Sequence, residues 1–211
     1  MKKLFLLCCL SALLCACGNS QTSSVPAPRL VGGPCEGCEA IFEFGNTPLH
    51  SIDTLPGFEE AGQKIKVSGR VYQQDGKTPA AGVILYVYQT NEAGIYENKY
   101  KQTNWESRHG YIRAWLKTGP DGRYAFYTLK PGSYPQRTTP AHIHLTVLEP
   151  DGKYYWLESY HFKGDPLLSP AEIAPDAPRG GSTGLLDLQQ QDGLWVGSRD
   201  IILGKHIPAY R

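Results

Sequence analysis

The chain has 211 residues, with 21 Lys and Arg against 20 Asp and Glu and a formal net charge of +1. This balance, without a basic stripe, argues against a nucleic-acid-binding function. Hydrophobic residues make up 41% of the chain, enough for one domain with a substantial core.

The first residues have the pattern of an export signal. Two lysines precede an apolar run at 4–14 that is too short to span a bilayer. The run ends in Leu-Cys-Ala-Cys-Gly at 14–18, which resembles a bacterial lipobox, although its first cysteine is unusual there. We therefore expect 1–16 to be a signal peptide, Cys17 to carry lipid and 17–30 to form a tether. The protein would then be exported and lipid-anchored at the cell envelope, at the outer membrane, with no other membrane contact.

Two cysteines remain for the folded domain once the signal and Cys17 are set aside, namely Cys35 and Cys38. A zinc site would need two further ligands nearby, and a thioredoxin-type motif would need a βαβ context. A lone C-x-x-C in an exported protein most often forms a local disulfide. We expect such a disulfide here, outside the active site.

From residue 64 onward, short strands alternate with turns. Polar and apolar residues alternate at 65–71, which indicates a half-buried strand, and the β-branched and aromatic run at 83–88 indicates a more buried one. Further strands are expected at 111–116, 124–129, 142–148, 154–162 and 201–203, and one short helical turn at 170–173. Residues 166–185 are rich in Pro, Gly and Ser and are expected to form a long loop. Together these features predict an all-β sandwich with long loops and little helix over 31–211.

Two histidines carry the first chemical signal. His142 and His144 lie two apart on a predicted strand, so their side chains project to the same side of the sheet. Imidazole suits Zn, Cu, Fe and Ni alike, so the pair by itself indicates a metal without selecting it.

Two tyrosines narrow the choice of metal. Tyr134 lies in a loop restricted by Pro135 and Pro140, which can bring it back toward the histidines, and Tyr96 follows a Gly turn after a buried strand. Phenolates are hard anionic donors that stabilise iron(III), and a ferric ion can in turn favour the dianion of a catechol.

Six segments together resemble the catalytic core of the intradiol ring-cleavage dioxygenases over roughly 64–165. They are Ser-Gly-Arg-Val at 68–71, Gly-Ile-Tyr at 94–96, Gly-Tyr-Ile-Arg at 110–113, Thr-Gly-Pro-Asp-Gly-Arg-Tyr-Ala-Phe at 118–126, Pro-Gly-Ser-Tyr-Pro at 131–135 and Pro-Ala-His-Ile-His at 140–144. The resemblance implies a prealbumin-like sandwich that holds one mononuclear non-haem Fe(III) through Tyr96, Tyr134, His142 and His144. It also implies that Tyr134 leaves the metal when a catechol chelates, and that O2 opens the ring between the two hydroxylated carbons.

Two departures from the family pattern stand out. The family usually has an arginine directly before Pro-Ala-His-Ile-His, where this chain has Thr139. Arg137, two residues earlier, is the candidate to supply that charge. The segment before the first core strand is short for the helical region of catechol dioxygenases, so a protocatechuate-type core is the closer match. Several catechols, and an oligomer, are compatible with the sequence.

Two other interpretations share part of the same motifs. Glu149 follows the histidine pair at a spacing that resembles half of a cupin metal site, which would make the two tyrosines bystanders. A prealbumin-like binding module without metal, or an iron-binding protein without turnover, is the non-enzymatic alternative. Packing or surface roles are expected for the other histidines and for strand tyrosines, among them His50, His109, His161, His206, Tyr86 and Tyr88.

Overall fold

The structure is a computed structural model that describes residues 27–99 and 104–211. The expected signal peptide, the expected lipidation site Cys17 and most of the expected tether lie outside the described residues. Within the described ranges, no helix has both the length and the apolar character needed to cross a membrane.

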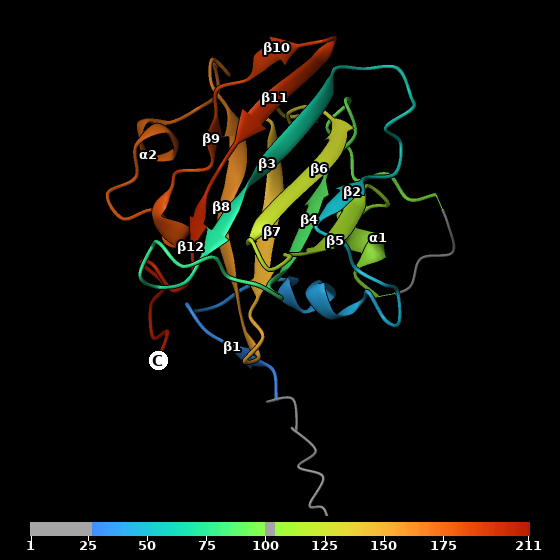
Figure 1. The fold of residues 1–211 in the computed structure, drawn as a ribbon. Helices are drawn as coiled ribbons and strands as arrows, with labels where there is room; N and C mark the ends of the chain where they lie inside the picture. The colour runs from blue at the N-terminus through green and yellow to red at the C-terminus, as the bar shows by residue number, and fades with distance from the viewer. Residues whose placement is uncertain (1–26, 100–103) are drawn as a thin grey trace, which may run out of the picture.

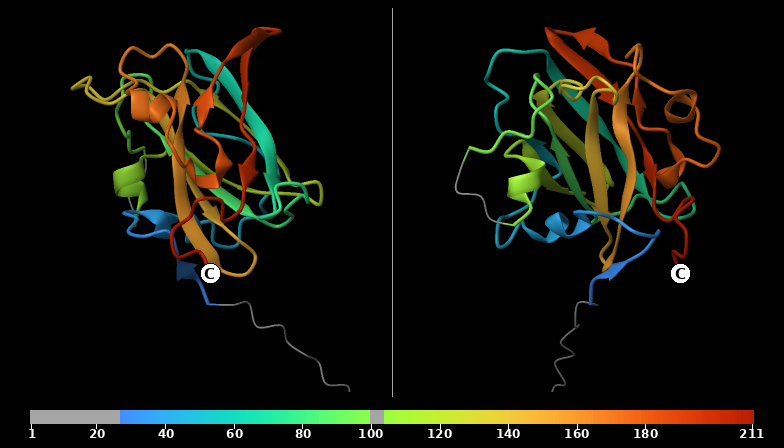
Figure 2. Two further views of the ribbon diagram at one scale, coloured as in Figure 1. Left: turned by 90° about the vertical axis from the view of Figure 1, so that its left-hand side faces the viewer. Right: turned by 180° about the vertical axis from the view of Figure 1, so that it is seen from behind.

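Two six-stranded sheets pack face to face, and the two layers are seen from the side in the left view of Figure 2. The first sheet has the order β1 (Arg29–Leu30), β8 (Lys153–Phe162), β7 (His142–Leu148), β4 (Ile84–Gln89) and β5 (Arg113–Lys117), and β9 (Leu185–Leu186) pairs with β8. The second has the order β10 (Gln189–Gln191), β11 (Leu194–Ser198), β3 (Lys64–Tyr72), β6 (Arg123–Leu129) and β2 (Ile52–Thr54), and β12 (Ile201–Ile202) pairs with β3 (Figure 1). The predicted all-β sandwich is confirmed.

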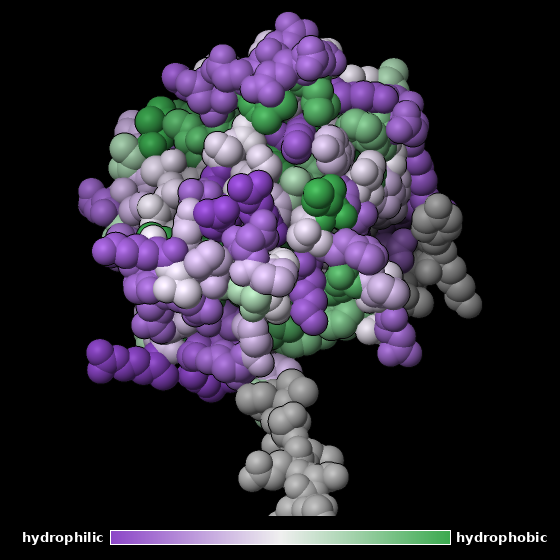
Figure 3. Space-filling model, in the orientation of Figure 1, coloured by the Kyte–Doolittle hydropathy of each residue, from purple (hydrophilic) through white to green (hydrophobic). Residues whose placement is uncertain are grey.

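Side-chain alternation along the strands builds the core between the sheets. Val67 of β3, Val87 of β4 and Ile143 of β7 are all fully buried there. The intervening residues of β3 are polar and point outward. In Figure 3, this outer face of the second sheet is mainly hydrophilic, with separate hydrophobic spots.

Helical segments are short and lie outside the sandwich. They are η1 (Cys38–Phe42), α1 (Glu106–His109), α2 (Pro170–Ile173) and η2 (Arg179–Gly181). The expected turn at 170–173 is α2, which begins with a capping box between Ser169 and Glu172. η1 packs on β4, β7 and β8, so it covers part of the outer face of the first sheet.

Among the expected strands the largest boundary difference is at 111–116, and β1, β2, β9, β10 and β11 are strands that the sequence did not predict. The strand expected at 111–116 begins only at Arg113, because the Arg113 amide bonds to the Tyr111 carbonyl at 3.0 Å in a bend. Tyr111 and Ile112 are nevertheless buried in the core. Their apolar character therefore reflects packing and not strand pairing.

Candidate metal centre

The histidine pair lies on the outer face of the first sheet. Ile143 between them points into the core and is fully buried, so His142 and His144 project together from the other side of β7. Their Nε2 atoms are 3.0 Å apart. The alternation thus brings two imidazoles to one point, as the sequence predicts.

The two tyrosines come from loops that are joined by close backbone contact. The Gly132 amide donates to the Asn91 carbonyl at 2.9 Å, and the Thr90 hydroxyl donates to the Gly132 carbonyl at 3.0 Å. Gly94 has a φ of +75°, and a Cβ there would lie 1.9 Å from the Ser133 carbonyl oxygen. Only glycine can adopt this backbone conformation and lie this close to the Ser133 carbonyl. The turn before Tyr96 is therefore fixed against the segment that carries Tyr134.

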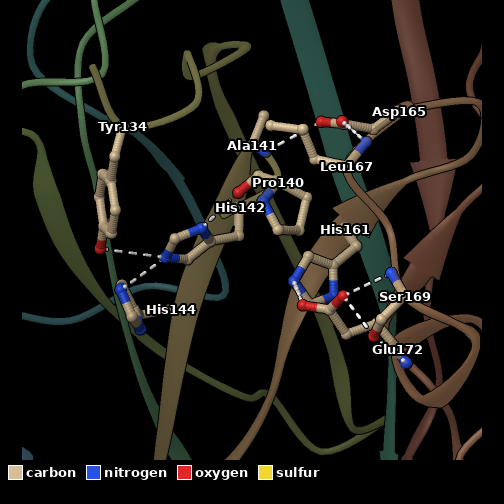
Figure 4. A network of polar contacts seen from close by, with 10 residues as sticks. All are labelled: Tyr134, Pro140, Ala141, His142, His144, His161, Asp165, Leu167, Ser169 and Glu172. Carbon is tan, nitrogen blue, oxygen red and sulfur yellow. Dashed lines mark hydrogen bonds and ion pairs between the residues drawn. The ribbon is translucent and has the colours of Figure 1, made fainter. Parts of the chain in front are cut away.

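Four donor atoms converge as a result. The Tyr96 hydroxyl lies 2.8 Å from the Tyr134 hydroxyl and 2.8 Å from Nε2 of His144. The Tyr134 hydroxyl lies 3.3 Å from Nε2 of His142 (Figure 4). Two phenol oxygens and two imidazole nitrogens thus form one closed ring of contacts.

The ring orientation of His142 is set by a hydrogen bond. Its Nδ1 donates to the Pro140 carbonyl at 2.7 Å, so in the neutral imidazole the lone pair is on Nε2. The next amide, of Ala141, donates to the Asp165 carboxylate at 2.9 Å and holds the start of β7 (Figure 4). An outer hydrogen bond of this kind is what fixes the tautomer of a metal-binding histidine.

Burial keeps His142, His144 and Tyr96 neutral when no cation is present. It lowers the pKa of His142 and lowers that of His144 well below the ordinary value of 6.5. Burial, and then the neighbouring Tyr134 hydroxyl, raises the pKa of Tyr96. A phenolate there needs a nearby positive charge, which a bound metal ion provides.

The donor set fits a metal ion. Ligand atoms bound at about 2 Å to one ion lie about 3 Å from each other, which matches the contacts of 2.8–3.3 Å among these four atoms. In the described part of the chain, no group of three or more His, Cys, Asp or Glu side chains could hold a metal ion. A centre at this position therefore depends on the tyrosines.

Two clefts lie beside the four donors. One, of about 330 Å³, is lined by His144, Tyr88, Trp156 and the segment 34–37. The other, of about 780 Å³, is lined on one side by Tyr134 and Arg137. Both are large enough for a single aromatic ring.

Arg137 and the cysteines lie outside the ring of donors. Arg137 is exposed, has a φ of +51°, and its amide donates to the Tyr134 carbonyl at 2.7 Å. Cys35 and Cys38 are joined by a disulfide with a Cα–Cα distance of 5.7 Å. The disulfide loop forms one wall of the smaller cleft.

The cupin interpretation is wrong for this chain. Glu149 follows the far end of β7, about 16 Å along the strand from His144 at about 3.3 Å per residue. Its carboxylate accepts hydrogen bonds from Tyr155 at 2.7 Å and Tyr210 at 2.8 Å. Glu149 therefore joins the C-terminal segment to β8 and does not reach the histidines.

Three aromatic residues for which packing or surface roles are expected pack beside the centre. Tyr88 pairs with His144 across β4 and β7, and its ring stacks on that histidine with a centroid distance of 4.3 Å. His109 of α1 stacks on the other side of Tyr88. His161 lies 6.0 Å from His142 between ring centroids, and its Nε2 is 3.7 Å from Glu172 (Figure 4). The alternation with Val87 predicts that Tyr88 points outward, but the sequence does not predict that its ring stacks on His144.

Comparison with known proteins gives the family. The profile of a family described as Dioxygenase matches residues 43–186. The protocatechuate 3,4-dioxygenase beta chain of Burkholderia cepacia is 34% identical, over 57% of this chain and 53% of its own length. Catechol 1,2-dioxygenase 1 of Acinetobacter lwoffii is 32% identical, over 67% of this chain and 48% of its own. The chain thus spans about half the length of these relatives.

Solved structures share the fold. An intradiol ring-cleavage dioxygenase from Tetranychus urticae has a TM-score of 0.54 at 17% identity, with 87% of this chain and 97% of its own covered. The dioxygenase domain of a dioxygenase carbohydrate-binding protein fusion from Streptomyces sp. SirexAA-E has a TM-score of 0.51 at 24% identity, with 84% and 97% covered. Since the family profile matches well over half of the residues, the chain belongs to the intradiol ring-cleavage dioxygenase family.

Proposed function

We propose that this protein is a non-haem Fe(III) dioxygenase that cleaves a catechol-type ring between its two hydroxylated carbons with O2. The convergence of the Tyr96, Tyr134, His142 and His144 donor atoms carries the proposal. These four residues would hold one mononuclear ferric ion. When bound, the ion supplies Lewis acidity that favours the catechol dianion.

Tyr134 is the donor that we propose gives way to the substrate. Its contact with His142, at 3.3 Å, is the longest of the four, and Tyr134 lines an open cleft. Its phenolic oxygen would then accept the proton that an incoming catechol hydroxyl loses. Tyr96, which touches both Tyr134 and His144 at 2.8 Å, would stay in place.

Arg137 is the proposed source of positive charge for the anionic substrate. It lines the same cleft as Tyr134 and stands close in sequence to Thr139, where the family usually has arginine. A guanidinium presents several N–H donors in a plane that suits anionic oxygens. It would stabilise negative charge on the ring oxygens without binding the metal.

The proposed setting is the cell envelope. Cys17 would carry a lipid anchor after removal of 1–16, with 17–30 as tether and 31–211 as the catalytic domain. The Cys35–Cys38 disulfide supports an oxidising compartment. We propose a catechol-type compound and O2 as partners, with the anchor as the only membrane contact.

Iron content and oxygen uptake test the proposed function. The purified protein is assayed for metal and for visible absorption, and then for O2 uptake with catechol, protocatechuate and hydroxyquinol, which are acted on by relatives of these names. We expect one iron per chain, a tyrosinate-to-iron absorption band, and a ring-opened product in which the two hydroxylated carbons have become carboxyl groups. A colourless protein that stays metal-free after iron reconstitution would contradict the proposal and favour a prealbumin-like binding module.

A further inference from the structure

Flat rings form a continuous column that starts at a candidate ligand. The ring of His144 stacks on Tyr88 with a centroid distance of 4.3 Å and an angle of 11°. Tyr88 stacks in turn on His109, at 3.8 Å and 7°. His109 then contacts Trp105 at 5.3 Å and 27°. The Tyr88 ring is therefore held between two imidazoles, one of which is a candidate ligand.

The inner part of the column is attached to the sheet. Tyr88 and His144 are cross-strand partners in β4 and β7. Nδ1 of His109 lies 2.9 Å from the hydroxyl of Tyr86, which is fully buried. Burial lowers the pKa of His109 to about 4, so this ring is neutral near pH 7. The stack therefore contains no repelling pair of cations.

The outer part of the column is closed by the disulfide loop. Gly37, between the two bonded cysteines, has a φ of +82°, and a Cβ there would lie 2.5 Å from Nε2 of His109. Cys38 is buried, with its sulfur 3.8 Å from the Thr146 hydroxyl on β7. The loop is thereby held against His109 on one side and against the metal-bearing strand on the other.

We propose that Tyr88 and His109 are positioning residues that fix the ring plane of His144 and so direct its Nε2 toward the metal, with the Cys35–Cys38 loop holding the outer end. Rings stacked in parallel at this separation leave His144 no space to rotate about its Cβ–Cγ bond. Metal ligands need to be held within about 10–20° of the productive direction. The inference rests on the proposed metal centre.

Ring-removing and ring-keeping variants test the proposal in the iron-loaded protein. Tyr88→Leu and His109→Leu should shift the tyrosinate-to-iron band and the ferric EPR signal and weaken iron retention roughly tenfold, as loss of an outer contact does. Tyr88→Phe should retain the wild-type spectra, because stacking needs only the ring. Tyr127→Leu, on the other sheet, is the matched control. Unchanged spectra and iron affinity in Tyr88→Leu, with only a lower Tm, would overturn the proposal.

A measurement without metal separates this inference from the proposed function. In the iron-free protein, NMR should show one sharp His144 Hε1 resonance for the wild type and a broadened or split one for Tyr88→Leu. If the wild type binds no iron but the resonances behave this way, the proposed function fails while the orienting role of Tyr88 stands. A resonance equally sharp in both proteins contradicts the orienting role.

Two glycines of one loop test the outer end. Gly37→Ala places a methyl against His109, whereas Gly33→Ala, with a similar φ of +90°, meets nothing within 4 Å. We expect Gly37→Ala to shift the EPR signal in the same direction as His109→Leu, and Gly33→Ala to leave it unchanged. Identical spectra for the two glycine variants would exclude a role for the loop.

Discussion

The hydroxyl of Tyr96 lies 2.8 Å from Nε2 of His144, although 48 residues separate the two along the chain. His144 is on the rigid strand β7, whereas Tyr96 is on a loop fixed by glycines. The centre therefore combines a strand-borne pair of nitrogens with loop-borne oxygens. The four donor atoms therefore come together only through contacts between β7 and the two tyrosine-bearing loops.

The tyrosinate absorption band should report directly on the two phenols. Tyr96→Phe and Tyr134→Phe each remove one oxygen donor, so each should weaken the band and lower the iron content of the purified protein. The double variant should be colourless. Tyr127→Phe removes a hydroxyl from the other sheet and should leave the band unchanged. Metal analysis with visible spectroscopy decides, and a full band in the double variant would rule out tyrosinate ligation.

The contact between the two tyrosine loops should be sensitive to one methyl group. In Gly94→Ala, a Cβ would lie 1.9 Å from the Ser133 carbonyl oxygen at a φ of +75°. Gly164→Ala has a φ of +87° and nothing within 4 Å. In Gly164→Ala the free energy of unfolding should fall only by the cost of an alanine in the left-handed conformation, about 1–2 kcal/mol. In Gly94→Ala the free energy of unfolding should fall further, and iron binding should be lost as well. Urea unfolding and metal content measure the two effects. Equal losses in the two variants would show that the loops can separate without harm.

These contacts mark the limit of what the sequence predicts. The period-2 pattern predicts that His142 and His144 share one face, because the geometry of a strand is local. The approach of Tyr96 to Tyr134 depends on Gly94 meeting Ser133, a tertiary contact that no local pattern contains. Edge strands such as Gln189–Gln191 are exposed and polar, and they are strands only through pairing with β11. The positions of Tyr88 and His109 likewise follow from pairing and from the covering segments.

Two variants test whether Arg137 provides the positive charge that the family usually has at the position of Thr139. If Arg137 supplies charge to the bound catecholate, Arg137→Ala should lower kcat/KM roughly tenfold and leave the iron content and absorption band unchanged. Thr139→Arg, which restores the charge at the usual family position, should raise oxygen uptake in the Arg137→Ala background. Arg123→Ala, at an exposed arginine on β6, is the control. Wild-type kinetics in Arg137→Ala would assign the charge to another group.

The segment before β2 should be held to the sheet by a largely buried ion pair. The Glu43 carboxylate accepts from Arg113 at 2.6 Å and from the Trp105 amide at 3.0 Å, and both charged side chains are less than one-fifth exposed. Glu43→Gln should destabilise the protein by about 1–3 kcal/mol, less than for an isolated buried pair because Glu106 lies 3.7 Å from Arg113. Glu59→Gln, in an exposed pair with Lys64, should have little effect. Urea unfolding of the two variants gives the comparison, and equal midpoints would contradict it.

Glu149 should make stability depend on pH without affecting the metal. Burial raises its pKa above the ordinary value of 4.5, so the folded protein keeps this proton to a higher pH than the unfolded chain does. The stability that the protonated form provides is complete below pH 4.5 and is lost as the pH rises through the folded-state pKa. Glu149→Gln resembles the protonated form. Its free energy of unfolding should therefore increase relative to that of the wild type as the pH rises above the folded-state pKa of Glu149.

Urea unfolding at several pH values measures this difference, and iron content measured on the same samples tests the location of Glu149. Because its carboxylate holds Tyr155 and Tyr210 at the far end of β7, Glu149→Gln should bind iron as the wild type does. A wild-type advantage that grows with pH would mean that the hydrogen bonds from the two tyrosines outweigh the cost of burying the charge. Loss of iron from Glu149→Gln at unchanged stability would instead indicate that the carboxylate contacts the metal centre, which its position at the far end of β7 contradicts.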